Sequence, residues 1–130
     1  MIDHVYIAVR DLAAATRFYG AVLAPLGYAK LHVLPKSIGF ARHGKGYAEF
    51  WLNHRPAMQP LAADNGVHVC LRALSTETVD AFHAAALKAG GSDNGAPGPR
   101  PEYSATYYAA FIRDPDGNRV EAVTFLAPGA

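Results

Sequence analysis

An internal repeat with an offset of 64 residues constrains the fold of this chain more than any other feature of the sequence. Internal repetition of this kind can determine a whole fold. In each copy, residues of alternating character typical of a strand are followed by a helical pattern that ends near a glycine. A histidine near the start of both first strands makes a two-sided site possible. The identical pairs at this offset include His4-Val5 with His68-Val69, Phe18 with Phe82, Ala21 with Ala85, Leu23 with Leu87 and Gly27 with Gly91.

The first copy predicts a strand, a helix and three further strands. Residues 3–10 alternate between apolar and polar side chains, and Asp11 has the short polar side chain of a helix N-cap. Apolar residues at helical spacing follow, until Pro25 and Gly27 end the helix. Three strand-like runs come next, at 27–34, 37–42 and 47–52, before a predicted break at 53–56.

The second copy repeats this order from Gly66, with a helix that ends at Gly90-Gly91. Residues 92–104 are rich in proline and glycine and predict a loop that forms a rim or lid over the site. Strands at 106–113 and 118–125 are joined by Asp114-Pro115-Asp116-Gly117, which suits a type I turn.

The predicted fold class is therefore α+β, with two tandem βαβββ modules that form a curved mixed-sheet groove. We expect a single domain, with module one at about 1–56, a connector at about 57–65 and module two at about 66–126.

The composition and charge of the chain limit the kinds of molecule that it is expected to bind. The chain has a net charge of +1 and no block of like charges, which argues against a nucleic-acid or anionic-membrane surface. No apolar run approaches transmembrane length. The absence of a signal-peptide pattern and the single cysteine, Cys70, lead us to expect a cytoplasmic protein. The candidate site residues described below lead us to expect a small-molecule partner.

Each module has a histidine on its first strand and a glutamate on its last, namely His4 with Glu49 and His68 with Glu121. If helices cover one side of each sheet, all four side chains project onto the uncovered, concave side. Two imidazoles and two carboxylates suit a divalent transition metal such as Zn, Ni, Mn, Fe or Co. In the alternative reading, the histidines are hydrogen-bonded core residues and the glutamates lie at solvated surfaces. The pseudo-symmetry of the four residues favours the metal site.

These residues resemble the vicinal oxygen chelate superfamily, on the βαβββ repeat and on the run Asp114-Pro115-Asp116-Gly117-Asn118-Arg119-Val120-Glu121. That superfamily includes glyoxalase I, methylmalonyl-CoA epimerase, extradiol dioxygenases, fosfomycin-resistance transferases and bleomycin-binding proteins. The resemblance covers essentially the whole chain. It implies that His4, Glu49, His68 and Glu121 match the metal ligands of glyoxalase I.

The resemblance to glyoxalase I is less complete at the positions where that enzyme contacts glutathione. Asn53 falls where glyoxalase I has an asparagine that touches glutathione, but Ala8 stands where that enzyme has an arginine for the glutathione carboxylate. Loss of a bidentate carboxylate clamp argues against glutathione as a substrate component.

The expected function is that of a metal-dependent glyoxalase-like isomerase, lyase or epimerase. The metal would polarise a carbonyl and stabilise an enediolate, with Glu121 as the general base and Glu49 as its symmetric counterpart. One alternative is a three-ligand dioxygenase or fosfomycin-resistance-type enzyme that uses His4, His68 and Glu121. The other is a non-catalytic protein that binds small molecules or antibiotics, as bleomycin-resistance proteins do.

Further residues are candidates for the substrate pocket. Cys70 reads as a small pocket-lining residue rather than a nucleophile. Arg72 either pairs with an anionic substrate or reaches solvent. The aromatic candidates could wall a pocket for a flat substrate, or belong to the core or an interface. The complete set is Tyr6, Trp51, Asn53, Cys70, Arg72, Arg100, Tyr103 and Tyr107.

We also expect a homodimer. Open, curved sheets have free edges that tend to be paired or covered, and the aromatic runs at 47–51 and 103–108 are typical of interfaces. The alternative is a monomer with these aromatic side chains turned inward.

Overall fold

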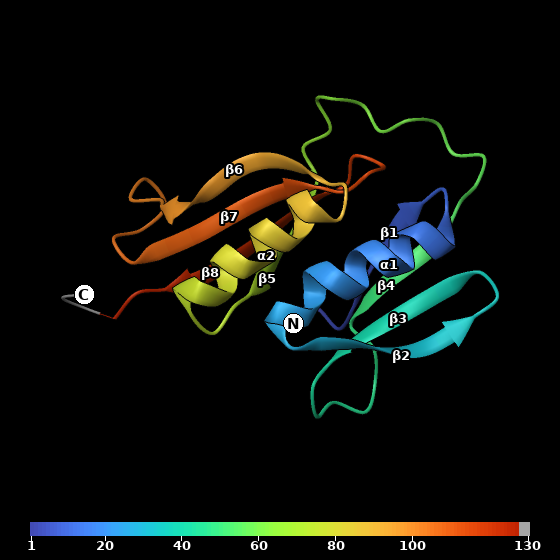
Figure 1. The fold of residues 1–130 in the computed structure, drawn as a ribbon, viewed down its shortest axis with the longest axis horizontal. Coiled ribbons are helices and arrows are strands. Elements are labelled where there is room, and N and C mark those ends of the chain that lie inside the picture. Colours follow the sequence, from blue (N-terminus) through green and yellow to red (C-terminus); the bar gives the residue numbers. More distant parts are fainter. Residues whose placement is uncertain (128–130) are drawn as a thin grey trace.

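The computed structural model describes residues 1–127, which form two βαβββ modules (Figure 1). The predicted α+β class is therefore confirmed. Module one contains β1 (Val5–Val9), α1 (Leu12–Leu23), a 3-10 turn (Ala24–Leu26), β2 (Tyr28–Leu34), β3 (Ser37–Arg42) and β4 (Phe50–His54). Module two contains β5 (His68–Arg72), α2 (Thr76–Lys88), β6 (Ser92–Pro99), β7 (Tyr107–Arg113) and β8 (Arg119–Phe125).

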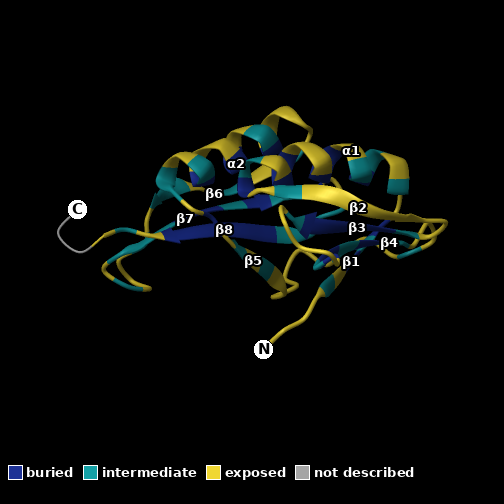
Figure 2. Cartoon of the chain, turned by 90° about the horizontal axis from the view of Figure 1, so that it is seen from below, coloured by how far each residue is buried: buried dark blue, intermediate teal, exposed yellow. Residues whose placement is uncertain are grey.

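Each module has one four-stranded sheet, with strand orders β1-β4-β3-β2 and β5-β8-β7-β6. The first strand of each module is parallel to the last, and the remaining pairs are antiparallel. Both helices lie on the same side of the two sheets, so the opposite side of each sheet stays uncovered (Figure 2). This is the arrangement that the predicted site requires.

The core lies between the helices and the covered sheet faces. The helices begin where short polar side chains cap them, since Asp11 accepts a bond from Ala14 N at 3.0 Å and Ser75 from Thr78 N at 3.2 Å. Fully buried side chains come from both modules and include Tyr19, Phe50, Phe82, Ile112 and Val120. One continuous apolar layer thus joins the modules.

The prediction of a loop at residues 92–104 is wrong for most of its length. Residues Ser92–Pro99 form β6, which pairs with β7 through irregular register between Asp93 and Gly95 and between Gly95 and Gly98. An edge strand tolerates proline and bulges because one of its sides makes no ladder hydrogen bonds. The predicted break at 53–56 also begins too early, because β4 continues through Asn53 and His54.

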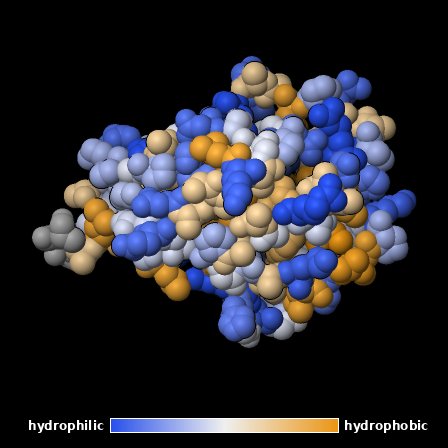
Figure 3. Space-filling model, viewed as in Figure 1, coloured by the Kyte–Doolittle hydropathy of each residue, from blue (hydrophilic) through white to orange (hydrophobic). Residues whose placement is uncertain are grey.

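No helix in the described part of the chain is long and apolar enough to cross a membrane. Polar and apolar residues are mixed over the helix-covered face, and an apolar patch lies over the β2–β3 hairpin at the right of Figure 3. The exposed apolar side chains of edge strand β2 include Val33 and Leu34.

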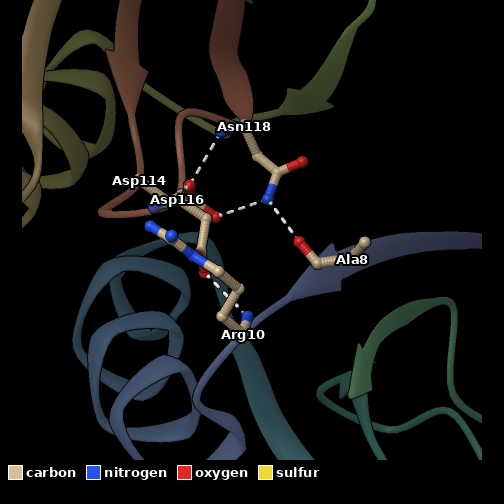
Figure 4. A network of polar contacts seen from close by, with 5 residues as sticks. All are labelled: Ala8, Arg10, Asp114, Asp116 and Asn118. Carbon is tan, nitrogen blue, oxygen red and sulfur yellow. Dashed lines mark hydrogen bonds and ion pairs between the residues drawn. The ribbon is translucent and has the colours of Figure 1, made fainter. Parts of the chain in front are cut away.

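The turn between β7 and β8 of module two makes hydrogen bonds to module one. The carboxylate of Asp114 is buried, and its Oδ2 accepts hydrogen bonds from Tyr19 Oη of α1 at 2.7 Å and from Asn118 Nδ2 at 2.9 Å. The same Asn118 Nδ2 donates to the Ala8 carbonyl of β1 at 2.8 Å (Figure 4). Module two therefore holds both the first strand and the helix of module one.

A second contact from this turn is more exposed. Arg10 Nε lies 3.0 Å from Asp116 Oδ1, and the Arg10 side chain is 47% exposed. Exposed ion pairs of this kind contribute little to stability. The buried Asp114 contacts are therefore the ones that hold the modules in place.

We predict that Tyr19→Phe lowers the free energy of unfolding by about 2 kcal/mol, because the buried Asp114 carboxylate loses a charge-assisted hydrogen bond. The control Arg10→Ala should cost less than about 1 kcal/mol. Urea denaturation of the three proteins measures both values. If both variants lowered the free energy of unfolding equally, the buried contact would not be the stronger of the two.

The effect of Tyr19→Phe should also depend on pH. Burial raises the pKa of Asp114 above its ordinary value of 3.8, while the bond from Tyr19 lowers it. A carboxyl with a raised pKa destabilises the folded state as the pH rises through that pKa. Removal of Tyr19 Oη raises the pKa further, so the variant should lose more stability at pH 7 than at pH 3. Denaturation at both values tests the sign.

Candidate functional site

The uncovered face of module two carries a close pair of predicted ligands. His68 Nε2 lies 3.0 Å from Glu121 Oε1, and the other oxygen of Glu121 accepts a 2.5 Å bond from Tyr107 Oη. The Glu121 side chain is only 3% exposed, whereas that of His68 is 46% exposed. Both oxygens of this buried carboxylate are engaged, so its position is fixed.

Cys70 lies directly opposite Glu121 in the β5–β8 ladder. The residue is exposed, but its thiol is shielded; this desolvation and the neighbouring Glu121 raise its pKa to about 12. Burial and the bond to Glu121 likewise raise the pKa of Tyr107. Both groups are therefore protonated at neutral pH, which fits a pocket-lining role for Cys70 and a donor role for Tyr107.

The uncovered face of module one carries the other two predicted ligands. His4 Nδ1 lies 2.7 Å from Asp3 Oδ1, and Lys45 Nζ donates to Glu49 Oε2 at 2.8 Å. The second oxygen of Glu49, Oε1, is buried and has no hydrogen-bond partner within the described residues. Glu49 thus has one oxygen held by a lysine and one that remains unsatisfied.

His4 and Glu49 share one hollow with His68, the exposed member of the other pair. A hollow of about 470 Å³ between the modules is lined by His4 and Glu49 from module one and by His68 and Cys70 from module two. Among the residues that the structure describes, no group of three histidine, cysteine, aspartate or glutamate side chains is placed to hold a metal ion. The structure therefore shows two half-sites that face a shared hollow.

The two half-sites differ in register. Glu121 pairs with Cys70, two residues beyond His68, and the position two beyond His4 is Tyr6, which pairs with Trp51. The structural counterpart of Glu121 is therefore Trp51, and the predicted equivalence of Glu49 and Glu121 is wrong. Glu49 lies two residues before Trp51, so its side chain is on the same face of the sheet. Its backbone carbonyl accepts a hydrogen bond from Val5 N at 2.9 Å, next to His4.

Trp51 forms an aromatic platform with its neighbours on module one. The ring of Tyr6 stacks on one part of the indole with centroids 5.4 Å apart, and His32 stacks at 5.7 Å. Tyr6 remains 51% exposed. Trp51 lies across Gly39, where an added Cβ would come within 2.9 Å of the indole and within 2.7 Å of Ala48 Cβ. The platform thus depends on a glycine.

We predict that Gly39→Ala destabilises the protein by about 1–3 kcal/mol, because the new methyl group clashes with Ala48 Cβ and displaces the Trp51 ring. Trp51 is the single tryptophan of the chain, so its fluorescence reports the displacement directly. The control is Gly20→Ala in α1, where nothing lies within 4 Å of an added Cβ. That variant should leave the spectrum unchanged and stabilise the helix slightly. An unaltered spectrum in Gly39→Ala would contradict the placement of Trp51.

The remaining candidates are dispersed. Asn53 pairs with Ala8 in the β1–β4 ladder, and Arg72 lies over the Phe125 ring at 4.7 Å. Neither lines the hollow of His4 and His68. Arg100 and Tyr103 instead line a second hollow beside His68.

Three residues near these sites were not predicted from the sequence. Lys45 holds Glu49, and Arg113 and Arg119 line the second hollow. The two arginines flank the turn at 114–118, so a hairpin at that turn would have placed them opposite each other. Lys45 gave no signal beyond its position four residues before Glu49.

Comparisons with known proteins agree with the fold. The model of the Glyoxalase/Bleomycin resistance protein/Dioxygenase superfamily matches residues 1–122. A glyoxalase/bleomycin resistance protein from Albidiferax ferrireducens T118 is 32% identical and has a TM-score of 0.78, covering 93% of this chain and 95% of that one. No curated protein matches the sequence.

Two more distant structures show the fold alone. A glyoxalase/bleomycin resistance protein/dioxygenase family enzyme from Burkholderia phytofirmans PsJN is 21% identical, with a TM-score of 0.72 and coverage of 96% and 98%. The fosfomycin resistance protein FosX from Listeria monocytogenes is 18% identical, with a TM-score of 0.67 and coverage of 95% and 91%.

Proposed function

Because the chain belongs to the glyoxalase/bleomycin resistance protein/dioxygenase superfamily, as its resemblance to the vicinal oxygen chelate group implied, we propose that it is a metal-dependent enzyme acting on a small substrate with adjacent oxygen atoms. The observation that carries this proposal is the pair of His68 and Glu121, whose donor atoms lie 3.0 Å apart, together with the hollow that His68 shares with His4 and Glu49.

The donor types of the two half-sites suit a divalent metal, although no three of these side chains converge on one point among the residues that the structure describes. A buried polar atom without a partner is costly, and Glu49 Oε1 is such an atom. Imidazole nitrogen and carboxylate oxygen from both half-sites give the donor types that Zn, Ni, Mn, Fe and Co accept. We therefore assign His4, His68 and Glu121 as ligands, with Glu49 beside them. When bound, the metal would supply a Lewis acid that polarises a carbonyl of the substrate.

The contacts of the two carboxylates support different roles for them. Both oxygens of Glu121 are engaged, by His68 and by Tyr107, so this carboxylate is fixed and suits a ligand. Glu49 has a free oxygen on the same hollow and is therefore the better general base for a proton on the carbon next to the carbonyl. This assignment revises the expectation that Glu121 is the base. The expected reaction is of the isomerase, lyase or epimerase type.

We predict about one equivalent of a divalent metal per chain in protein purified without added metal, measured by elemental analysis. His68→Ala and Glu121→Gln should each weaken metal affinity at least about tenfold, because removal of even a supporting contact has effects of that size. His43→Ala, which changes an exposed histidine that lines neither hollow, is the matched control.

Two outcomes would contradict this assignment. The first is unchanged affinity in both variants, and the second is equal loss in the control. A wild-type protein that binds no divalent metal, even with zinc in excess, would instead favour the non-catalytic small-molecule-binding alternative, for which the exposed aromatic platform offers a surface.

The register difference favours a second candidate, a three-ligand enzyme of the dioxygenase or fosfomycin-resistance type. In that enzyme His4, His68 and Glu121 suffice, and Trp51 occupies the position that a fourth ligand would take. If Glu49 is the base, Glu49→Gln should keep its metal and lose activity toward any substrate found by screening. If Glu49 is dispensable, the variant should keep both, and the three-ligand class is favoured.

We also propose that the protein is a homodimer, because the edge strands and the exposed apolar residues of β2 remain uncovered in one chain. Sedimentation at micromolar concentration should give twice the mass of one 13.9 kDa chain. A single species at the mass of one chain would refute this proposal.

A further inference from the structure

A second hollow, of about 490 Å³, lies on the uncovered side of module two. Its charged lining consists of three arginines, Arg100, Arg113 and Arg119, and His68 stands at its border. His68 also lines the hollow shared by the two half-sites. The arginines therefore lie next to the proposed metal centre.

The strand register concentrates this charge. Arg113 lies directly opposite Arg119 in the β7–β8 ladder, and Arg119 lies directly opposite His68 in the β5–β8 ladder. Three basic side chains thus share one rung across three strands. Like charges directly opposite each other destabilise a sheet, so the arrangement has a cost to folding.

Nothing within the described residues neutralises the arginines. Among residues 1–127, none of the three has a carboxylate oxygen within 4.0 Å. Arg100 donates to backbone carbonyls of Ala96 and Gly98, and Arg119 donates to the carbonyl of Ala63. Carbonyl acceptors hold the guanidinium groups in place while leaving their charge uncompensated.

One carboxylate, that of Asp93, lies close enough to interact electrostatically with Arg100. The pKa of Asp93 is lowered mainly by its bond from His83, and Arg100 makes a smaller contribution. Asp93 Oδ1 already accepts from His83 Nε2 at 2.8 Å and from Gly95 N at 3.0 Å. The hollow itself therefore stays cationic.

We propose that this hollow binds an anionic group of the substrate, a carboxylate or a phosphate. The planar guanidinium group matches both anions through paired N–H donors. The Phe111 ring, 5.4 Å from the Arg100 guanidinium carbon, supports one wall. The exposed phenol of Tyr103 adds a further donor at the rim.

This placement specifies the class of substrate, a step that rests on the proposed function. The adjacent oxygens would face His68 and Glu121, and the anionic group would lie on the far side of His68 among the arginines. The substrate is then a small acid, or a small phosphate ester, in which the anionic group and the adjacent oxygens stand at opposite ends.

The test uses protein freed of metal with EDTA and then dialysed free of the chelator, at low ionic strength, so that it does not depend on the metal site. Inorganic phosphate and malonate are titrated separately by calorimetry. We expect saturable binding of at least one of them, and the preferred anion distinguishes a phosphate from a carboxylate substrate.

Variants locate the anion. Arg113→Gln and Arg119→Gln should each weaken binding at least about tenfold, since each removes a charge-assisted contact. Arg113→Lys should recover part of the affinity, because it keeps the charge without the planar fork. Arg17→Gln, an exposed residue of α1, removes the same charge and should bind as the wild type does.

Three results would overturn the proposal: no saturable binding of either anion, unchanged affinity in the glutamine variants, or an equal loss in Arg17→Gln. If a glutamine variant fails to fold, Arg113→Lys and Arg119→Lys decide the matter, since wild-type affinity in both would exclude bidentate recognition. Failure here with metal bound as predicted would leave the proposed function intact. If the protein bound no metal, the proposed function would fail, and the titration of metal-free protein would still decide whether the anion site exists.

Discussion

The carboxylate of Asp114 is the contact on which the site geometry depends. It is buried, which would be costly without partners, yet it accepts four hydrogen bonds, from Tyr19 Oη, Asn118 Nδ2, Asn118 N and Asp116 N. The two bonds from backbone N–H groups fix the turn, and the bond from Tyr19 joins it to the helix of module one. Asn118 Nδ2 also donates to the Ala8 carbonyl of β1. The first strand of one module and the last strand of the other are thereby held together, and with them His4 and Glu121.

The repeat produces two modules with the same topology and different chemistry. Module one presents a stacked aromatic surface, made by Tyr6, Trp51 and His32, whereas module two presents a buried carboxylate and arginines. The helix-packing faces stay alike because both must bury apolar residues against the same core. The uncovered faces are free of that requirement, so the two copies have different residues there.

The sequence was sufficient to predict the architecture because the covered faces follow simple periodicities. It failed at β6, where prolines and glycines predict a loop, because an edge strand with bulges has no periodic pattern and tolerates both residues. It identified four site residues by type and spacing, but matched Glu49 to Glu121. Each glutamate lies on the last predicted strand of its module, and only the hydrogen-bond register shows that Trp51 is the counterpart of Glu121. The arginine hollow was missed because Arg113 and Arg119 are far from His68 in sequence and meet it only through the ladder.

The register also explains why the two carboxylates have different contacts. Glu121 projects between Cys70 and Phe111, its partners in the neighbouring strands, and Tyr107 reaches it from four residues away along β7. A carboxylate in the middle of a sheet is enclosed on both sides and is held by neighbours of fixed position. Glu49 precedes β4, at the open end of its sheet, where a flexible lysine is its bonded partner. A fixed carboxylate suits a ligand, whose geometry must be constant, and one at a sheet end suits a base, which must exchange a proton. The difference in role that we propose for Glu49 and Glu121 thus follows from where each residue falls in its ladder.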